Sequence, residues 1–281
     1  MLSLITLASA KAQSLFEPVN SSRSGVSFKN IIVENATQNA LTYENLFNGG
    51  GIAVGDINND GLEDIYFISN MQLNKLYLNQ GNFKFKDITQ AAGVAGRVGW
   101  KSGTSMVDIN GDGLLDIYVC YSGKADAEKR RNQFFINQGD LTFIDKAQEM
   151  GLDDPSYTTQ VSFFDYDRDG DLDAFLLATN VKVIRDLEYS QARKSKHPYA
   201  GDKLFRNDNG RFSEVTEEAG ILSNALGFGL GVTVSDVNKD GWLDIYVSND
   251  YAEPDYLYIN NRNGTFTNKL DVSLQHISQF S

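Results

Sequence analysis

The sequence predicts an all-β fold, a β-propeller built of four-stranded blades, on three observations. The motif DINNDGLED at residues 56–64 is followed by three further copies along the 281-residue chain. Each copy lies between a short apolar run and a run of β-branched and aromatic residues. Two more such runs, joined by Asn/Gly turns, complete each unit. A period of about 50 residues with four strands per unit is typical of propeller blades.

The motif keeps its pattern at every copy. Residues 108–116 read DINGDGLLD, residues 165–173 read DYDRDGDLD, and residues 236–244 read DVNKDGWLD. All four copies carry Asp at position 1, Asn or Asp at position 3, Asp at position 5, Gly at position 6 and Asp at position 9. We therefore treat the nine residues as one repeated loop.

The repeats divide the chain into blades. One blade cannot bury both faces of its sheet alone, so successive blades must stack around an axis. The first run of each unit is apolar and contains Gly or small residues in most copies, which suits the crowded innermost position. The predicted blades cover residues 49–93, 101–151, 158–220 and 228–270 of a propeller region at 15–281.

The two ends of the chain resemble parts of further blades. Residues 15–28 resemble a fourth strand with its turn and are expected to close the last blade. Residues 276–281 occupy the place where the first strand of another blade begins. We expect an incomplete ring in this chain, with the remaining blades in a longer natural protein. A four-bladed ring that ends early is the alternative.

The N-terminus suggests export. Residues 1–14 contain an apolar run, Leu2–Ala10, followed by small residues in an Ala-x-Ala pattern, as in the second half of a secretory signal peptide. The single cysteine, Cys120, lies among strand-forming residues and is expected to be a buried thiol. No apolar run is long enough to cross a membrane as a helix.

Charge restricts the partners. The chain carries 37 acidic and 25 basic residues, for a formal net charge of −12. Such a chain attracts cations, and bulk electrostatics do not draw it to nucleic acid.

The repeated loop offers only oxygen ligands, which favours calcium. Positions 1, 3, 5 and 9 supply side-chain oxygens, position 7 a backbone carbonyl, and Gly at position 6 permits the sharp turn. The loops contain no His or Cys, which disfavours zinc and copper. An EF-hand loop would need Glu at position 12, where this chain has Phe67, Val119, Leu176 and Val247. An Asx-rich turn that binds nothing remains the alternative.

These residues carry a family resemblance. GIAVGDINNDGLEDIYF resembles the FG-GAP/VCBS repeat, the calcium-loop blade of integrin α-subunit propellers. NKLYLNQGNFKFKDITQAAGV and GDKLFRNDNGRFSEVTEEAGI resemble the secreted proteins related to cartilage acidic protein. The resemblance implies a seven-bladed propeller, an extracytoplasmic location (secreted, periplasmic or cell surface) and about four Ca²⁺ ions, one per blade loop.

The resemblance also implies a ligand set for each loop, with the position-7 residue contributing its carbonyl oxygen. In chain order the implied ligands are Asp56, Asn58, Asp60, Leu62 and Asp64; Asp108, Asn110, Asp112, Leu114 and Asp116; Asp165, Asp167, Asp169, Asp171 and Asp173; and Asp236, Asn238, Asp240, Trp242 and Asp244.

The function predicted from these features is an exported, calcium-stabilised module that binds a protein or glycan without catalysis. One alternative is a propeller lyase or hydrolase acting on polysaccharide, for which Tyr189, Arg193 and His197 in the basic insertion 181–202 are the candidate residues. Another alternative is a cell-surface adhesion domain. The sequence does not choose between a protein and a glycan ligand.

Overall fold

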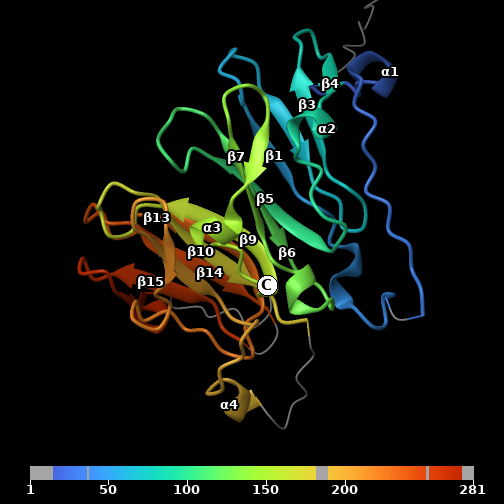
Figure 1. The fold of residues 1–281 in the computed structure, drawn as a ribbon. Coiled ribbons are helices and arrows are strands. Elements are labelled where there is room, and N and C mark those ends of the chain that lie inside the picture. The colour runs from blue at the N-terminus through green and yellow to red at the C-terminus, as the bar shows by residue number, and fades with distance from the viewer. Residues whose placement is uncertain (1–14, 37, 182–188, 251–252, 274–281) are drawn as a thin grey trace, which may run out of the picture.

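The computed structural model describes residues 15–36, 38–181, 189–250 and 253–273. Within these residues, sixteen strands form four antiparallel sheets of four strands each, and helices are limited to single turns. Every sheet is a meander in which strands consecutive in sequence are neighbours. The predicted all-β fold of four-stranded propeller blades is thereby confirmed (Figure 1).

The strand bounds repeat the same pattern in each blade. The first sheet contains β1 (Ile52–Gly55), β2 (Asp64–Phe67), β3 (Lys75–Asn79) and β4 (Phe85–Asp87); the second contains β5 (Lys101–Val107), β6 (Asp116–Tyr121), β7 (Gln133–Asn137) and β8 (Phe143–Asp145). The third contains β9 (Thr158–Phe164), β10 (Asp173–Ala178), β11 (Lys203–Asn207) and β12 (Phe212–Glu214); the fourth contains β13 (Gly229–Ser235), β14 (Asp244–Asn249), β15 (Tyr256–Asn260) and β16 (Phe266–Asn268).

The first strands of the sheets lie next to one another. β1 packs beside β5, β5 beside β9, and β9 beside β13, so the blades follow one another in chain order around these strands. The approach is close: a Cβ added at Gly103 in β5 would lie 2.3 Å from the carbonyl oxygen of Thr159 in β9. Only glycine fits such a contact, which explains the glycine in this innermost strand.

Apolar layers between successive sheets form the core. Tyr66 and Leu76 of the first sheet belong to one buried cluster with Ile117 and Val119 of the second, and two similar clusters join the second sheet to the third and the third to the fourth. Each fully buried side chain of this size stabilises the fold by about 1.5–3 kcal/mol. Cys120 lies in the second layer as the buried thiol that the sequence predicts, and burial raises its pKa.

Single helical turns complete the corners and connections. They are α1 (Ser21–Ser24), η1 (Glu44–Phe47), α2 (Thr89–Ala92), η2 (Ala127–Lys129), α3 (Ala147–Met150), α4 (Tyr189–Ala192) and α5 (Leu270–Ser273). Helices α2 and α3 follow the fourth strand of their blades and end at Gly93 and Gly151, both left-handed. The helices among the described residues are too short and too polar to cross a membrane.

Residues 15–28 do not form the expected strand. Helix α1 occupies the middle of the segment, and residues 15–28 join none of the four sheets. A strand is stable only when a neighbour satisfies its backbone groups, so the isolated segment stays irregular. Residues 1–14 and 276–281, assigned to a signal peptide and to another blade, lie outside the described residues.

The corner at α1 nevertheless contacts the first blade as the other corners contact theirs. A Cβ added at Gly25 would lie 2.4 Å from the carbonyl oxygen of Phe85, and one added at Gly151 would lie 2.7 Å from that of Phe212. The amide of Ser27 donates to the Tyr77 hydroxyl at 3.2 Å, as the amide of Leu222 donates to Tyr258 at 3.1 Å in the last blade pair. Residues 21–27 thus occupy the position of a preceding blade's corner.

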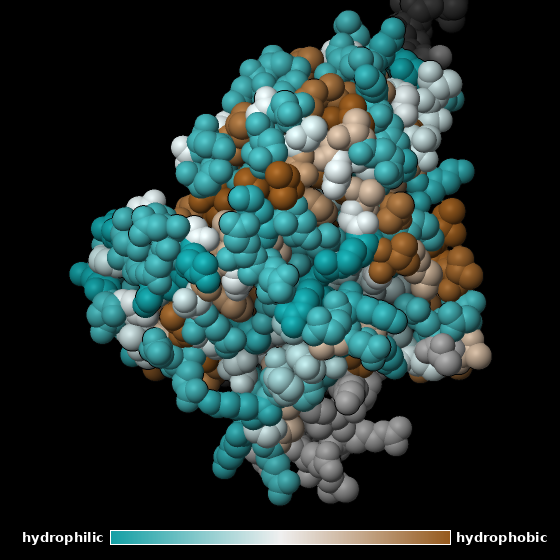
Figure 2. Space-filling model, in the orientation of Figure 1, coloured by the Kyte–Doolittle hydropathy of each residue, from teal (hydrophilic) through white to brown (hydrophobic). Residues whose placement is uncertain are grey.

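The inner part of the first sheet stays open. Ile52 and Val54 of β1 are 61% and 56% exposed, whereas Val161 and Val232 in the corresponding strands of the third and fourth sheets are buried by the preceding sheet. Apolar residues also reach the surface in the upper part of Figure 2, where Figure 1 places strands of the first and second sheets.

One side chain in each blade joins the second strand to the start of the third. Its oxygen accepts a hydrogen bond from the backbone amide at or just beyond the end of the second strand, at 2.7–3.4 Å. The four residues are Asn74, Asn132, Asp202 and Asp255, and all are buried. Burial, with the charge of Glu253, raises the pKa of Asp202 to about 7.

The raised pKa of Asp202 predicts that the free energy of unfolding depends on pH. A folded-state pKa above the ordinary value means that the folded chain binds more protons, so stability falls as pH rises from about 4 to about 7. We expect Asp202→Asn to raise the free energy of unfolding at pH 8 by about 2–4 kcal/mol and to leave it unchanged near pH 3. Urea denaturation at both pH values, with EDTA present, measures the difference.

The second blade supplies the matched control. Asn132→Asp should introduce the opposite change, a loss of stability at pH 8 that disappears at low pH. Equal effects of Asp202→Asn at both pH values would show that Asp202 is not protonated more readily in the folded state.

Candidate metal centres

The four loops named from the sequence lie at one end of the sheets. Each connects the first and second strands of its blade: β1 to β2, β5 to β6, β9 to β10 and β13 to β14. Because every sheet runs in the same order from the innermost strand, the four connections fall at the same relative position in each blade. The structure therefore places the twenty predicted ligand residues in four separate, equivalent loops.

The Asp at position 1 organises each turn. In the first loop, Asp56 accepts hydrogen bonds from the amides of Asp60 at 3.1 Å and Gly61 at 2.7 Å. The position-6 amide makes the same bond to the first Asp in the other three loops, at 2.8–3.2 Å. Gly61 has a φ of 83°, and its three counterparts are also left-handed, which explains glycine at position 6.

Position 4 is left-handed as well, although it is glycine in only one loop. The φ angles are 57° at Asn59, 69° at Gly111, 65° at Arg168 and 62° at Lys239. Asn tolerates this conformation better than most residues, whereas Arg and Lys adopt it at a cost. The left-handed backbone at position 4 therefore depends on the rest of the loop and not on the residue type at that position.

The Asp at position 9 is buried and connects three strands. Asp64, at the start of β2, is fully buried and accepts from the amide of Ile57 at 3.1 Å and from that of Asn79 at 2.7 Å. Both bonds recur in every blade at 2.7–3.2 Å. The equivalent residues are Asp116, Asp173 and Asp244, and all are fully buried.

Burial makes ionisation of this Asp unfavourable in the second and third loops. It raises the pKa of Asp116 to about 6 and that of Asp173 to about 7, against the lowering effect of the two amide bonds. The charges of Asp167 and Asp169 raise the pKa of Asp173 further. A cation among these carboxylates would oppose both effects.

The sequence interpretation missed the Asn that ends the third strand. Asn137 donates to the carbonyl of Leu115 at 3.2 Å and accepts from the amide of Gly139 at 3.0 Å. The equivalent Asn of every other blade also donates to the position-8 carbonyl of its loop. It also accepts a hydrogen bond from a backbone amide in the turn between the third and fourth strands. Asn79, Asn137, Asn207 and Asn260 share one place in the repeat, a signal that from the sequence alone indicates only a hairpin turn.

The donor set fits a hard cation. In the third loop, carboxylate oxygens of Asp165, Asp167 and Asp173 lie within 4.8 Å of one another. The other loops have Asn at position 3, so Asn58 and its counterparts contribute an amide oxygen there. A carboxylate that accepts two amide bonds keeps further lone pairs, so the buried Asp can still contact an ion. Carboxylates, amide oxygens and carbonyls are the ligands that calcium prefers.

The candidate catalytic residues serve other contacts. His197 accepts from the amides of Tyr199 at 3.2 Å and Ala200 at 3.0 Å through Nδ1, and its ring stacks on Tyr157. Arg193 pairs with buried Glu253 at 3.0 Å. The side chain of Tyr189 lies outside the described residues. Among the described residues, His197 and Arg193 are thus engaged in contacts within the fold.

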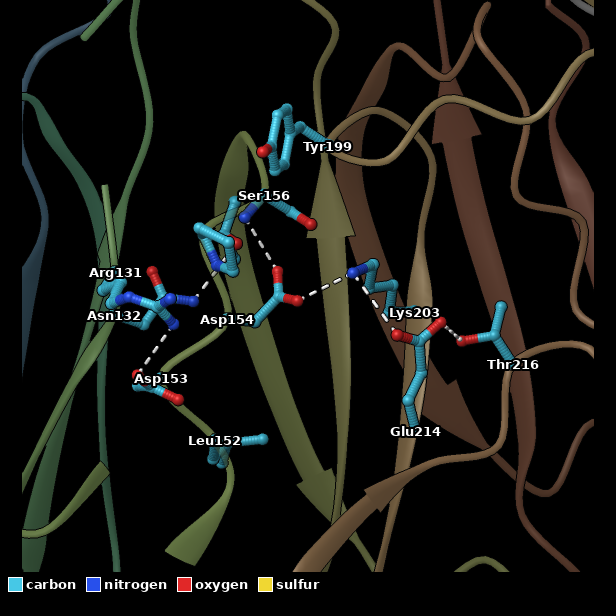
Figure 3. A network of polar contacts seen from close by, with 12 residues as sticks. Arg131, Asn132, Leu152, Asp153, Asp154, Ser156, Tyr199, Lys203, Glu214 and Thr216 are labelled. Carbon is cyan, nitrogen blue, oxygen red and sulfur yellow. Dashed lines mark hydrogen bonds and ion pairs between the residues drawn. The ribbon is translucent and has the colours of Figure 1, made fainter. Parts of the chain in front are cut away.

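Three basic residues of the second and third blades are paired with an acid or packed on an aromatic ring. Arg131 binds Asp153 at 2.9 Å, and Lys203 binds Asp154 at 2.7 Å (Figure 3). Arg130 is buried, with its guanidinium carbon 4.4 Å from the ring centroid of Tyr157. These contacts connect the segment between the second and third blades to both of them, which is a structural role.

The chain shares sequence with curated proteins. It is 27% identical over 220 residues to cartilage acidic protein 1 of Mus musculus, covering 78% of this chain and 32% of that protein. It is 29% identical over 209 residues to the Xenopus tropicalis protein, covering 73% and 29%. The chain thus spans about a third of the length of the curated relatives it matches.

Two solved structures resemble the chain at low identity. One is a lectin of Agrocybe aegerita that recognises non-reducing terminal N-acetylglucosamine, with a TM-score of 0.47, 18% identity, and coverage of 86% of this chain and 55% of that one. The other is a Tc holotoxin pore of Photorhabdus luminescens, with a TM-score of 0.33, 19% identity, and coverage of 70% and 8%. Scores below 0.5 do not define a shared fold.

A family model decides the assignment. The model of the FG-GAP-like repeat matches residues 56–119, 195–247 and 236–280, which together are more than half of the chain. The matched segments contain the first, second and fourth loops, and the third loop has the same geometry. The chain therefore belongs to the family of FG-GAP-like repeat proteins.

Proposed function

We propose that this chain is an exported, calcium-stabilised propeller module that binds a glycan or protein and catalyses no reaction. The observation that carries the proposal is the fourfold recurrence of one oxygen-lined loop closed by a fully buried Asp. A solvated acidic turn has no need to bury its last carboxylate, because burial without a counter-charge is unfavourable. A bound cation gives that burial a physical reason.

The proposed ligands are the side chains at positions 1, 3, 5 and 9 and the carbonyl at position 7 of each loop. Calcium accepts such sets of six to eight oxygens with variable geometry, whereas magnesium requires a near-ideal octahedron and keeps its water. Four Ca²⁺ ions would change the formal net charge from −12 to about −4. The metal sites would then account for most of the acidity of the chain.

A non-catalytic role agrees with the relatives and with the side-chain contacts. The curated matches are cartilage acidic proteins, and their name gives no reaction. In this chain, His197 and Arg193 already bind backbone amides and Glu253. A polysaccharide lyase or hydrolase is therefore the weaker proposal, and a cell-surface adhesion domain remains one form of the binding module.

The ligand surface that we propose is the mouth formed by the innermost strands at the end opposite the metal loops. A pocket of about 360 Å³ opens there, and Tyr43, Trp100, Thr104 and Gln160 contribute to its lining. None of the residues that line it is charged, although the chain is strongly acidic. Hydroxyl, amide and aromatic groups favour an uncharged carbohydrate over an ionic ligand.

Calcium is expected to raise the stability of the whole chain. A ligand that binds only the folded state stabilises it by about 2.7 kcal/mol per site at a hundredfold excess over Kd. Thermal melts in EDTA, in rising Ca²⁺ and in Mg²⁺ should therefore show a large increase in Tm that is specific to calcium. A cooperative melt that ignores calcium would make the four loops acidic turns.

The carbohydrate surface has its own test. Isothermal titration with cellobiose, maltose and N,N′-diacetylchitobiose should detect binding by at least one disaccharide, and Gln160→Glu should weaken it at least tenfold. Gln80→Glu, on an exposed hairpin at the metal-loop end, is the matched control and should leave binding unchanged. Equal affinities for both variants would remove the pocket from the binding site.

A further inference from the structure

We infer that the metal loops respond to calcium as two coupled pairs, the first with the second and the third with the fourth. Asn59 and Arg168, both at position 4 of their loops, are the positioning residues of this coupling. The inference rests on the proposed calcium function and adds a regulation to it. Its basis is a set of hydrogen bonds that cross two of the three blade boundaries and that the described residues do not repeat at the remaining one.

In the first pair, the side chain at position 4 reaches the next loop. The Asn59 amide donates to the carbonyl oxygen of Gly113 at 2.8 Å. Gly113 is position 6 of the second loop, directly before Leu114, whose carbonyl is a proposed ligand. The left-handed backbone at Asn59 accompanies this contact. The first loop therefore holds the backbone of the second beside its metal site.

The second pair has the same contact made by a different residue. The Arg168 guanidinium donates to the carbonyl oxygen of Gly241, which is position 6 of the fourth loop. Its central carbon also lies 4.9 Å from the ring centroid of Trp242, the position-7 residue of that loop. A hydrogen bond and a cation–π contact thus connect the third loop to the fourth.

A second hydrogen bond crosses each of these two blade boundaries. Asn137 of the second blade donates to the carbonyl of Ile57 in the first loop at 2.8 Å. Asn260 of the fourth blade donates to the carbonyl of Tyr166 in the third loop, also at 2.8 Å. Ile57 and Tyr166 are position 2, the residue whose amide binds the buried Asp of its own loop.

The boundary between the second and third loops differs. Position 4 of the second loop is Gly111, which has no side chain to reach the third loop. Asn207 of the third blade binds the carbonyl of Leu172 in its own blade, and the described residues show no bond from it to the second loop. Among the described residues, two boundaries therefore carry both links and one carries neither.

These links can transmit calcium binding because a metal orders the whole turn. When a cation fixes positions 1 to 9, it also fixes position 4, and with it the carbonyl that position 4 binds in the next loop. The neighbour then loses less conformational freedom when it binds its own ion, which is positive coupling. For one or two hydrogen bonds we expect roughly a 2- to 10-fold change in the neighbour's calcium affinity.

Trp242 provides a local reporter for the test. It belongs to the fourth loop, while Trp100, the second tryptophan of the chain, lies at the opposite end of the blades. Calcium titrations of the whole chain, followed by Trp242 fluorescence, give the affinity of the fourth loop. Calorimetry on the same samples establishes whether calcium binds at all, and no binding there would overturn the proposed function as well as the coupling.

We expect that loss of the third-loop ligands, and not loss of the first-loop ligands, lowers the calcium affinity of the fourth loop. Removing its ligands with Asp167→Ala and Asp169→Ala should weaken calcium binding at Trp242 by about 2- to 10-fold. Adding Arg168→Ala should reduce that dependence to the part that the Asn260–Tyr166 bond transmits. Matched removal of first-loop ligands with Asn58→Ala and Asp60→Ala should leave the Trp242 midpoint unchanged, because no link joins the first loop to the fourth among the described contacts.

Two outcomes would overturn the inference while calcium binding stands. The fourth-loop affinity could ignore the loss of third-loop ligands, or the dependence could persist unchanged in Arg168→Ala. A gain-of-link variant gives an independent measurement. Gly111→Asn introduces a residue type that tolerates the left-handed backbone of this position. A Cβ at Gly111 would meet no atom within 4 Å. Gly111→Asn should increase the cooperativity of calcium binding measured by calorimetry, whereas Gly111→Ala should not.

Discussion

A buried carboxylate at the start of each second strand is the interaction on which the rest of this structure depends. Asp64 and its three counterparts accept amide bonds from the loop that precedes them and from the third strand. One side chain therefore fixes the relative positions of three strands and the turn between two of them. Its burial requires compensation for a negative charge, and the surrounding loop gathers the oxygens that would bind a cation.

The blades are stable only in combination. Each sheet is four short strands whose apolar faces are covered by the neighbouring sheets, so the core consists of layers between blades. Asx side chains connect strands at both ends of a blade, with Asn132 and Asn137 serving the second blade. Packing and these bonds together hold the loops in equivalent positions, which allows one loop sequence to be used four times.

Contacts between blades give the repeats individual properties. Asn59 and Arg168 occupy the same position of their loops and reach the next loop by different chemistry, while Gly111 cannot. Repeats that agree in their proposed metal ligands thus differ in their connections. If calcium stabilises the module as we propose, these connections decide whether the sites act singly or together.

The repeat, the four strands per blade and the loop pattern could be predicted from the sequence, because strand periodicity, turn residues and Asp spacing are local features. The sequence did not reveal the roles of Asn79 and its counterparts, the paired state of Arg131 and Arg193, or the irregular path of residues 15–28. Those depend on which groups lie together after packing. Burial of position 9 and the links across blades exist only when strands distant in sequence become neighbours, so the tertiary structure alone decided them.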